Sequence, residues 1–167
     1  PEIEPYKQEV CSPYNELATS KMNEMTEIQI QQFFKRIESL TFESKPSFGK
    51  MNVNQMVCHC ADFYRMAKGT KKANEYGKIS QSDIIGLIKS GKSTPTPSGF
   101  GQTEGQGTQP TDLEKDIRVL KEHILEFSNF NKNYKFAVHP YFGDIEHKRW
   151  NELAIYHLNH HLAQFGV

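Results

Sequence analysis

The chain has 167 residues, enough for a single domain with a sizeable hydrophobic core. Its 20 lysines and arginines balance its 20 aspartates and glutamates, so there is no electrostatic case for a nucleic-acid partner or an acidic membrane. No apolar run approaches the roughly 20 residues of a membrane span, and no secretory signal is recognisable within the sequence. Because the sequence begins at Pro1 and not at a methionine, it leaves open whether a leader was removed.

The first clear helix is predicted to begin at Thr26, after an N-terminal arm over residues 1–25. Thr26 and Gln29 have the spacing of a capping box. The apolar residues that follow repeat at helical spacing: Ile30, Phe33, Phe34, Ile37 and Leu40. They predict one buried face.

A second helix is predicted from Asn52, with Gln55 three residues on, to the neighbourhood of Gly69. Its apolar stripe is Val53, Met56, Cys60, Phe63 and Ala67. His59 lies about 60° from the centre of that stripe, which is compatible with a seam between helices.

Residues 70–110 are predicted to form a long loop with a short helix that Ser82 and Asp83 would cap. The part from Lys92 to Pro110 contains four glycines, three prolines and six serines or threonines, which cannot form a packed element alone. It is interpreted either as a surface loop or as a lid over a site.

A third helix is predicted after a capping box formed by Thr111 and Glu114. Its stripe is Leu113, Ile117, Leu120, Ile124 and Phe127. A turn follows at residues 139–144, and Asp144 is the expected N-cap of the last helix. His123 and His147 lie off the stripes and are expected at the surface.

The pattern of elements predicts an all-α fold. Four amphipathic helices and no convincing strand favour a four-helix bundle, with residues 1–167 as one domain and a long connection between helices 2 and 3. That connection permits a crossover, and the sequence leaves the order of the helices open.

The last helix, from Trp150 to Val167, carries three histidines. At about 100° per residue, His157 and His161 fall on the stripe that should be buried, whereas His160 falls near its edge. Two imidazoles one turn apart can share a metal ion, and His59 would be a third ligand that leaves a position open for water or substrate. The alternative is that they are hydrogen-bonded core residues.

The three cysteines do not form a disulfide framework or a Cys-x-x-Cys zinc site. Cys58 and Cys60 flank His59, but adjacent helical residues diverge and cannot all face one ion. They are predicted to be reduced packing residues, and the expected compartment is the cytoplasm.

Three segments taken together resemble one family. They are Met51–His59, His139–Gly143 (His-Pro-Tyr-Phe-Gly), and His157–Gly166 with Trp150 before it. Over roughly residues 26–166 they are similar to an uncharacterised branch of the DinB-like superfamily, related to YfiT-type metal-dependent enzymes.

The resemblance implies a four-helix bundle that binds a divalent metal, such as zinc, nickel or iron, through His59, His157 and His161. His160 and His139 belong to the pattern of this branch, and we expect them to act around the ligands rather than as ligands. Related proteins include thiol-cofactor transferases, a thiol-dependent isomerase and hydrolases, and no substrate motif chooses among them.

The resulting hypothesis is a metal-dependent enzyme of transferase or hydrolase type, acting on a small molecule with a metal-activated thiol or water. No catalytic residue is assigned. Asp62 is the carboxylate nearest to His59, although an exposed helix residue is the expected reading. The competing hypothesis is a non-catalytic bundle with structural histidines or a structural metal that binds a partner or small ligand. The sequence is compatible with a homodimer.

Overall fold

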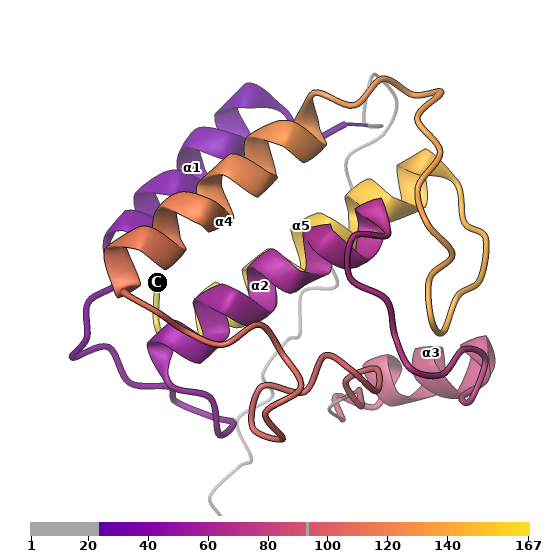
Figure 1. The fold of residues 1–167 in the computed structure, drawn as a ribbon, viewed down its shortest axis with the longest axis horizontal. Helices are drawn as coiled ribbons and strands as arrows, with labels where there is room; N and C mark the ends of the chain where they lie inside the picture. Colours follow the sequence, from indigo (N-terminus) through magenta and orange to yellow (C-terminus); the bar gives the residue numbers. More distant parts are fainter. Residues whose placement is uncertain (1–23, 93) are drawn as a thin grey trace, which may run out of the picture.

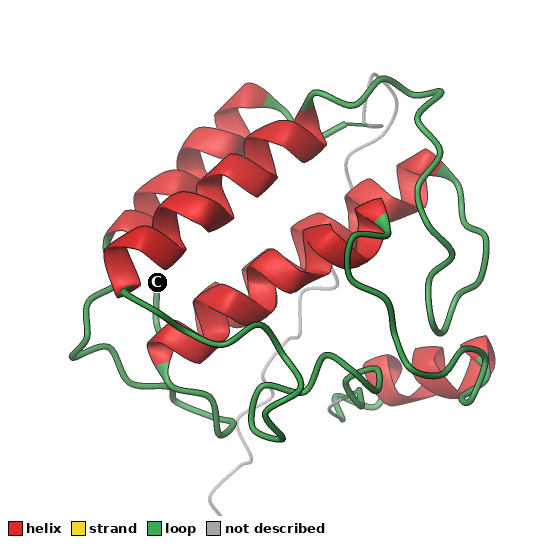
Figure 2. Ribbon diagram, in the orientation of Figure 1, coloured by secondary structure: helices red, strands yellow, loops and turns green. Residues whose placement is uncertain are grey.

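The computed structural model describes residues 24–92 and 94–167, and over these residues the chain forms five α-helices and no strand (Figures 1 and 2). The helices are α1 (Glu27–Glu38), α2 (Val53–Lys68), α3 (Gln81–Lys89), α4 (Leu113–Ser128) and α5 (His147–Gln164). The predicted all-α class is thereby confirmed. The predicted N-terminal arm lies almost wholly outside the described residues, and Met25 at its end is buried in the core.

The first two helices begin where their sequences predict. Thr26 and Gln29 form a reciprocal capping box at α1, and Asn52 and Gln55 form another at α2. Gly69 ends α2 in the left-handed conformation, with φ 76°, which costs glycine no strain. Local signals therefore fix both ends of α2, the helix that carries His59: a capping box at its start and a left-handed glycine at its end.

The start of α4 differs from its prediction. The side chain of Asp112, and not that of Thr111, accepts the hydrogen bond from the backbone of Lys115. Thr111 donates instead from its backbone and its hydroxyl to Asp116, at 2.8 and 2.9 Å. Thr111 and Asp112 are both suitable capping residues. Because Thr111 is bonded to the carboxylate of Asp116, Asp112 is the N-cap.

The other two predicted caps were also misplaced. Ser80, two residues before the expected Ser82, caps α3 by accepting from the backbone of Asp83. The N-cap of α5 is Glu146 rather than Asp144, and its side chain makes no capping hydrogen bond. Packing of the helix, rather than a local cap, therefore sets where α5 begins.

Four helices share the core, and α3 stands apart from them. The helices α2 and α1 each pack against both α4 and α5, so the four enclose a common apolar interior (Figure 1). The predicted stripes supply it, with side chains such as Ile37, Met56 and Ile124 fully buried. Helix α3 lies on the connection between α2 and α4, below the core helices in the view of Figure 1.

The connection over residues 70–110 contains the predicted short helix, α3, and then returns to α2. Its last part is tied down by Asp62, whose carboxylate accepts hydrogen bonds from the backbone and the hydroxyl of Thr108 and pairs with Arg65. Asp62 is 0 % exposed, so the expectation of an exposed helix residue was wrong. A buried carboxylate needs such partners, and a loop 46 residues away supplies them.

None of the helices in the described part of the chain combines the length and the apolar character that crossing a membrane requires.

Candidate metal centre

Three histidines from two packed helices converge on one point. His59 comes from α2, and His157 and His161 lie one turn apart on α5. Their ring centroids are 4.6 to 4.9 Å apart, and each offers a ring nitrogen within 4.8 Å of the other two. The predicted convergence of this triad is confirmed.

The register of α5 against α2 is fixed two turns before the triad. Trp150 is fully buried, and its ring meets Phe63 of α2 edge-on with centroids 5.8 Å apart. Phe63 in turn stacks on the ring of His157 at 5.0 Å. Large aromatic contacts of this kind contribute about 0.5–1.5 kcal/mol each beyond their buried area. They hold the α5 histidines in place opposite His59.

The two closest ring nitrogens belong to His59 and His157. Their Nε2 atoms are 3.0 Å apart, so one ring donates a proton to the other. Without that proton, both Nε2 lone pairs would face the same point, which is the arrangement that a shared cation requires.

His161 is oriented by a chain of hydrogen bonds that ends on a loop. The amide of Gln164 donates to the carbonyl of Phe48 at 2.6 Å, which leaves its oxygen facing His161 Nδ1 at 3.0 Å. His161 therefore carries its proton on Nδ1 and keeps the Nε2 lone pair free. Gly49 approaches so closely that any side chain there would collide with the Gln164 amide.

Burial keeps all three imidazoles neutral. It lowers the pKa of His59 to about 4 and that of His161 to about 3, and it lowers the pKa of His157 well below its usual value. The neighbouring histidines lower the pKa of His157 and His161 further, whereas Asp62 and the backbone of Phe100 act in the opposite direction on His59. Neutral imidazoles are the form that binds metal ions.

His160 lies beside the triad without joining it. Its ring meets that of His161 edge-on at 4.9 Å and stacks on Tyr156 at 6.2 Å, and the residue is exposed. Its contact with His161 is between ring faces and edges, not a hydrogen bond. The placement near the edge of the stripe agrees with the helical geometry of the sequence.

His139 shapes a turn. Its Nδ1 accepts the backbone N–H groups of Tyr141 and Phe142, at 3.1 and 3.2 Å, and its backbone pairs with Gly143. The residue is 6 % exposed, and burial, with a smaller contribution from Arg149, lowers its pKa to about 4. The predicted turn is confirmed, and His139 is its internal hydrogen-bond acceptor.

A cavity of about 230 Å³ opens beside the triad. The three histidines, His160 and His139 form part of its wall, and Ile84 and Ile88 of α3 face it with residues 94–97. The His139 turn holds both ends of this covering segment, because Gln81 donates to Phe142 O at 2.7 Å and the Tyr141 hydroxyl donates to Pro95 O at 3.1 Å. Of the two interpretations of the long connection, the cover over a site describes this part.

Two other histidines, expected at the surface, are only partly exposed. The side chain of His123 is 17 % exposed and lies 3.2 Å from Lys68 Nζ. His147 is half-buried, packs on Phe136 with ring centroids 5.2 Å apart, and has its Nε2 buried without a partner. Both are partly buried, and neither is part of the triad.

The cysteines next to His59 are packing residues, as predicted. Cys58 and Cys60 are buried free thiols, and burial raises the pKa of Cys58 to about 12. Neither thiol contributes to the histidine group. They are therefore unreactive at neutral pH.

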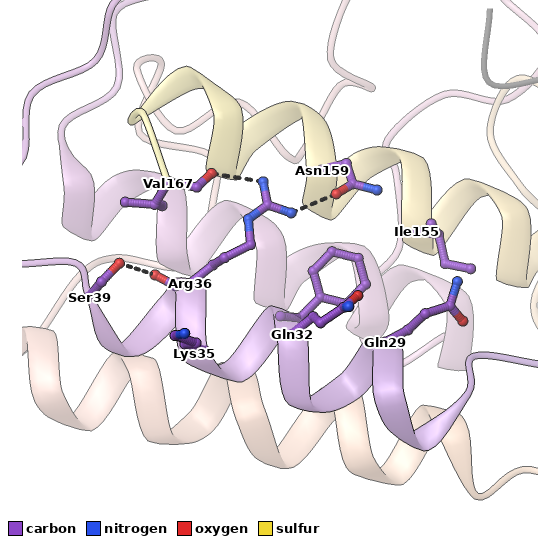
Figure 3. Close-up of a pocket in the computed structure, with 9 residues that line it drawn as sticks. Gln29, Gln32, Lys35, Arg36, Ser39, Ile155, Asn159 and Val167 are labelled. Atoms are coloured by element: carbon purple, nitrogen blue, oxygen red, sulfur yellow. Dashed lines mark hydrogen bonds between the residues drawn. The ribbon is translucent and has the colours of Figure 1, made fainter.

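A larger hollow of about 600 Å³ lies on the other side of α5, against α1 (Figure 3). Its main polar group, the guanidinium of Arg36, donates to Asn159 Oδ1 at 2.6 Å and to the carbonyl of Val167 at 2.8 Å. These bonds tie α1 to the end of α5 and give two guanidinium nitrogens acceptors. Among the described residues that line this groove there is no group of metal ligands, so the candidate site is the smaller cavity.

Residues 85–166 match the model of a protein family of unknown function, DUF1569. The matched segment includes His139, His157, His160 and His161, but not His59. Comparisons with curated proteins and with solved structures give no match.

Sequence reasoning missed the groups that orient the triad. Gln164 follows His161 by three residues, and this spacing could have indicated a hydrogen bond on one helix face. The carbonyl of Phe48 carries no local signal, because it depends on how the loop before α2 packs against the end of α5.

Proposed function

We propose that this protein is a metal-dependent enzyme of DinB-like type, which acts on a small molecule through a divalent ion held by His59, His157 and His161. The observation that carries the proposal is the convergence of three neutral imidazoles from α2 and α5 in the wall of a cavity. The reaction class is transfer or hydrolysis, and the substrate or co-substrate is a small molecule such as a thiol.

The triad fits a metal of the kind that imidazole prefers. Two nitrogens at about 2.0–2.1 Å from one tetrahedral ion are roughly 3.3 Å apart, and the Nε2 atoms of His59 and His157 are 3.0 Å apart. The amide of Gln164 fixes the ring of His161, as hydrogen-bonded partners of metal ligands commonly do. Zinc, nickel and iron all suit such a ligand set.

The ligand count supports catalysis rather than structure. Structural zinc sites are closed by four protein ligands, whereas catalytic sites have three and keep one position open. Among the described residues the group holds three, and a cavity adjoins it. A divalent ion held in this way lowers the pKa of a bound water or thiol, and so supplies a nucleophile at neutral pH.

Asp62 is not the base in this proposal. Both of its oxygens are occupied by Thr108, and Arg65 pairs with one of them. Its role is to hold Thr108, near the end of the connection that leads to α4, against α2.

Cobalt(II) substitution tests the proposal, because its visible spectrum reports coordination number and changes when an outside ligand binds. We expect the chain to take up one cobalt ion per molecule and the spectrum to change when azide is added. The variant His157→Ala should take up none. A spectrum that azide leaves unchanged would favour a closed, structural ion, and the absence of uptake by the unaltered chain would refute the site.

A further inference from the structure

His139 lies in the wall of the cavity beside the triad, although it belongs to a turn and not to a core helix. Its side chain is buried, whereas the polar lining residues on the connection between α2 and α4, which are Lys92, Thr94 and Thr96, are exposed. Whatever polar atom His139 offers is therefore offered to the interior of the cavity and not to bulk solvent.

The hydrogen bonds of the turn fix which ring nitrogen of His139 carries the hydrogen. Nδ1 accepts the backbone N–H groups of Tyr141 and Phe142, at 3.1 and 3.2 Å, so this nitrogen is unprotonated. Burial, with a smaller contribution from Arg149, lowers the pKa of His139 to about 4, so the ring is neutral at physiological pH. A neutral imidazole with a bare Nδ1 carries its hydrogen on Nε2.

The Nε2–H group of His139 has no acceptor among the described residues of the protein. It is not sealed off, in contrast to Nε2 of His147, which is buried without a partner. Because His139 lines the cavity, a molecule inside it can reach this donor. A donor in such a place favours an occupant whose oxygen accepts its hydrogen bond.

The ring of His139 is held in one orientation. Its backbone N–H and carbonyl pair with Gly143, at 2.8 and 2.9 Å, and its ring packs on Phe142 and Trp150 with centroids 4.8 and 5.2 Å apart. Turning the ring would break both hydrogen bonds to Nδ1. The Nε2–H donor is therefore positioned before any ligand binds, which lowers the entropy that binding costs.

The following inference rests on the proposed function, which places the substrate in this cavity. We infer that His139 is a substrate-binding residue whose Nε2–H donates a hydrogen bond to an uncharged carbonyl oxygen of the substrate, as in a ketone or an ester. The apolar part of the molecule packs on Phe63, Phe142 and Ile84, and the volume of about 230 Å³ keeps it small. A fixed, neutral donor holds and polarises a carbonyl oxygen, whereas an ammonium group there would meet a second donor.

Nitrogen-15 NMR of the metal-free full chain, labelled in its histidine side chains, tests the inference with two probes. They are acetophenone and α-methylstyrene, which has the same shape with a methylene group in place of the carbonyl oxygen. We expect the His139 signals, identified by their loss in His139→Asn, to show hydrogen on Nε2, and the Nε2 signal to move with acetophenone only. Hydrogen on Nδ1, or an Nε2 signal that acetophenone leaves in place, would overturn the inference.

Two variants separate the turn from the cavity. In His139→Asn the amide oxygen can replace Nδ1 as the acceptor of the turn, but no donor reaches the position of Nε2. In His139→Gln the longer side chain brings an amide N–H to that position and gives up the acceptor.

The two variants should therefore have opposite effects. His139→Asn should reduce the affinity for acetophenone relative to α-methylstyrene by about three- to tenfold, with little change in melting temperature. His139→Gln should keep the relative affinity and melt at a lower temperature. An unchanged relative affinity in His139→Asn, or no binding of acetophenone to the unaltered chain, would contradict the assigned role.

The probes are applied without metal, so their result does not depend on the ion. Zinc uptake is measured separately on the unaltered chain and on His139→Asn, and both should bind one ion, because His139 is not part of the triad. A chain that selects acetophenone but takes up no zinc would refute the metal-dependent function and still support the role of His139. The two failures are thereby distinguishable.

Discussion

Helix α5 borders two hollows, and they differ in how their polar atoms are used. In the groove against α1, the guanidinium of Arg36 donates hydrogen bonds to Asn159 and to the carbonyl of Val167. In the smaller cavity, His59 and His157 have only each other as partners for their facing nitrogens. Buried ring nitrogens that face one another without other partners indicate where a ligand binds, and the size of a hollow does not.

The largest effect on zinc binding is expected from the removal of a histidine ligand. His157→Ala should abolish stoichiometric zinc binding, with a loss in affinity of more than about 100-fold, because two imidazoles replace three. Competition with a chromogenic chelator measures the affinity. His160→Ala is the matched control on the same helix and should bind one zinc ion. Equal losses in both variants would show that His160 is a ligand.

The histidine triad and the groove against α1 should also contribute differently to the pH dependence of stability. The folded pKa values of His59 and His161, about 4 and about 3, lie below that of an unfolded histidine. The unfolded chain therefore binds more protons between about pH 6.5 and pH 4, and stability is present above this window and falls as the pH is lowered through it.

The expected slope is about 1.4 kcal/mol per pH unit for each such histidine. Urea unfolding of the metal-free chain at several pH values measures it. In the variant His161→Gln, the slope of stability against pH should fall by the contribution of about one histidine. In Asn159→Ala, on the groove side, the slope should be unchanged. A stability that is flat from pH 6.5 to pH 4 would contradict the neutral state of the triad.

Much of the fold was predictable because its determinants are local. The capping boxes at Thr26 and Asn52 lie within four residues of sequence, and both were predicted correctly. The start of α4 was not, because the choice between Thr111 and Asp112 depends on the side chain of Asp116 in the folded helix.

The candidate site was also predictable only where its determinants are local or belong to the family resemblance. The spacing of His157 and His161 shows in the sequence that they share a face of α5, and convergence with His59 followed from the family resemblance. The roles of Asp62 and Phe48 depend on loops that return from far along the chain, at separations of 46 and 116 residues from their partners. No periodicity in the sequence reports such contacts.

A smaller effect should follow from changing the support of the triad. Gln164→Leu removes the acceptor for His161 Nδ1 and should weaken zinc binding by about 10–100-fold, as loss of a ligand's hydrogen-bond partner commonly does. The control is Asn159→Leu, on the groove side of α5, which should leave zinc affinity unchanged. If Gln164→Leu binds zinc normally, the orientation of His161 is set by packing alone.

The smallest effect is expected from the groove itself. Arg36→Ala removes the bonds to Asn159 and Val167 and should lower the free energy of unfolding by about 1 kcal/mol. Zinc affinity should stay within twofold of the unaltered chain. Thermal unfolding and chelator competition on the same samples measure both. A large loss of zinc binding would show that the groove and the cavity are coupled through α5.

The most direct test of the central claim is X-ray absorption spectroscopy at the zinc edge of the zinc-loaded chain. We predict three imidazole nitrogens at about 2.0–2.1 Å and one lighter donor that is replaced when 2-phenylethanethiol is added. In His59→Ala the imidazole count should fall. Four protein ligands that the thiol cannot displace, or an imidazole signal that survives His59→Ala unchanged, would contradict an open site built from His59, His157 and His161.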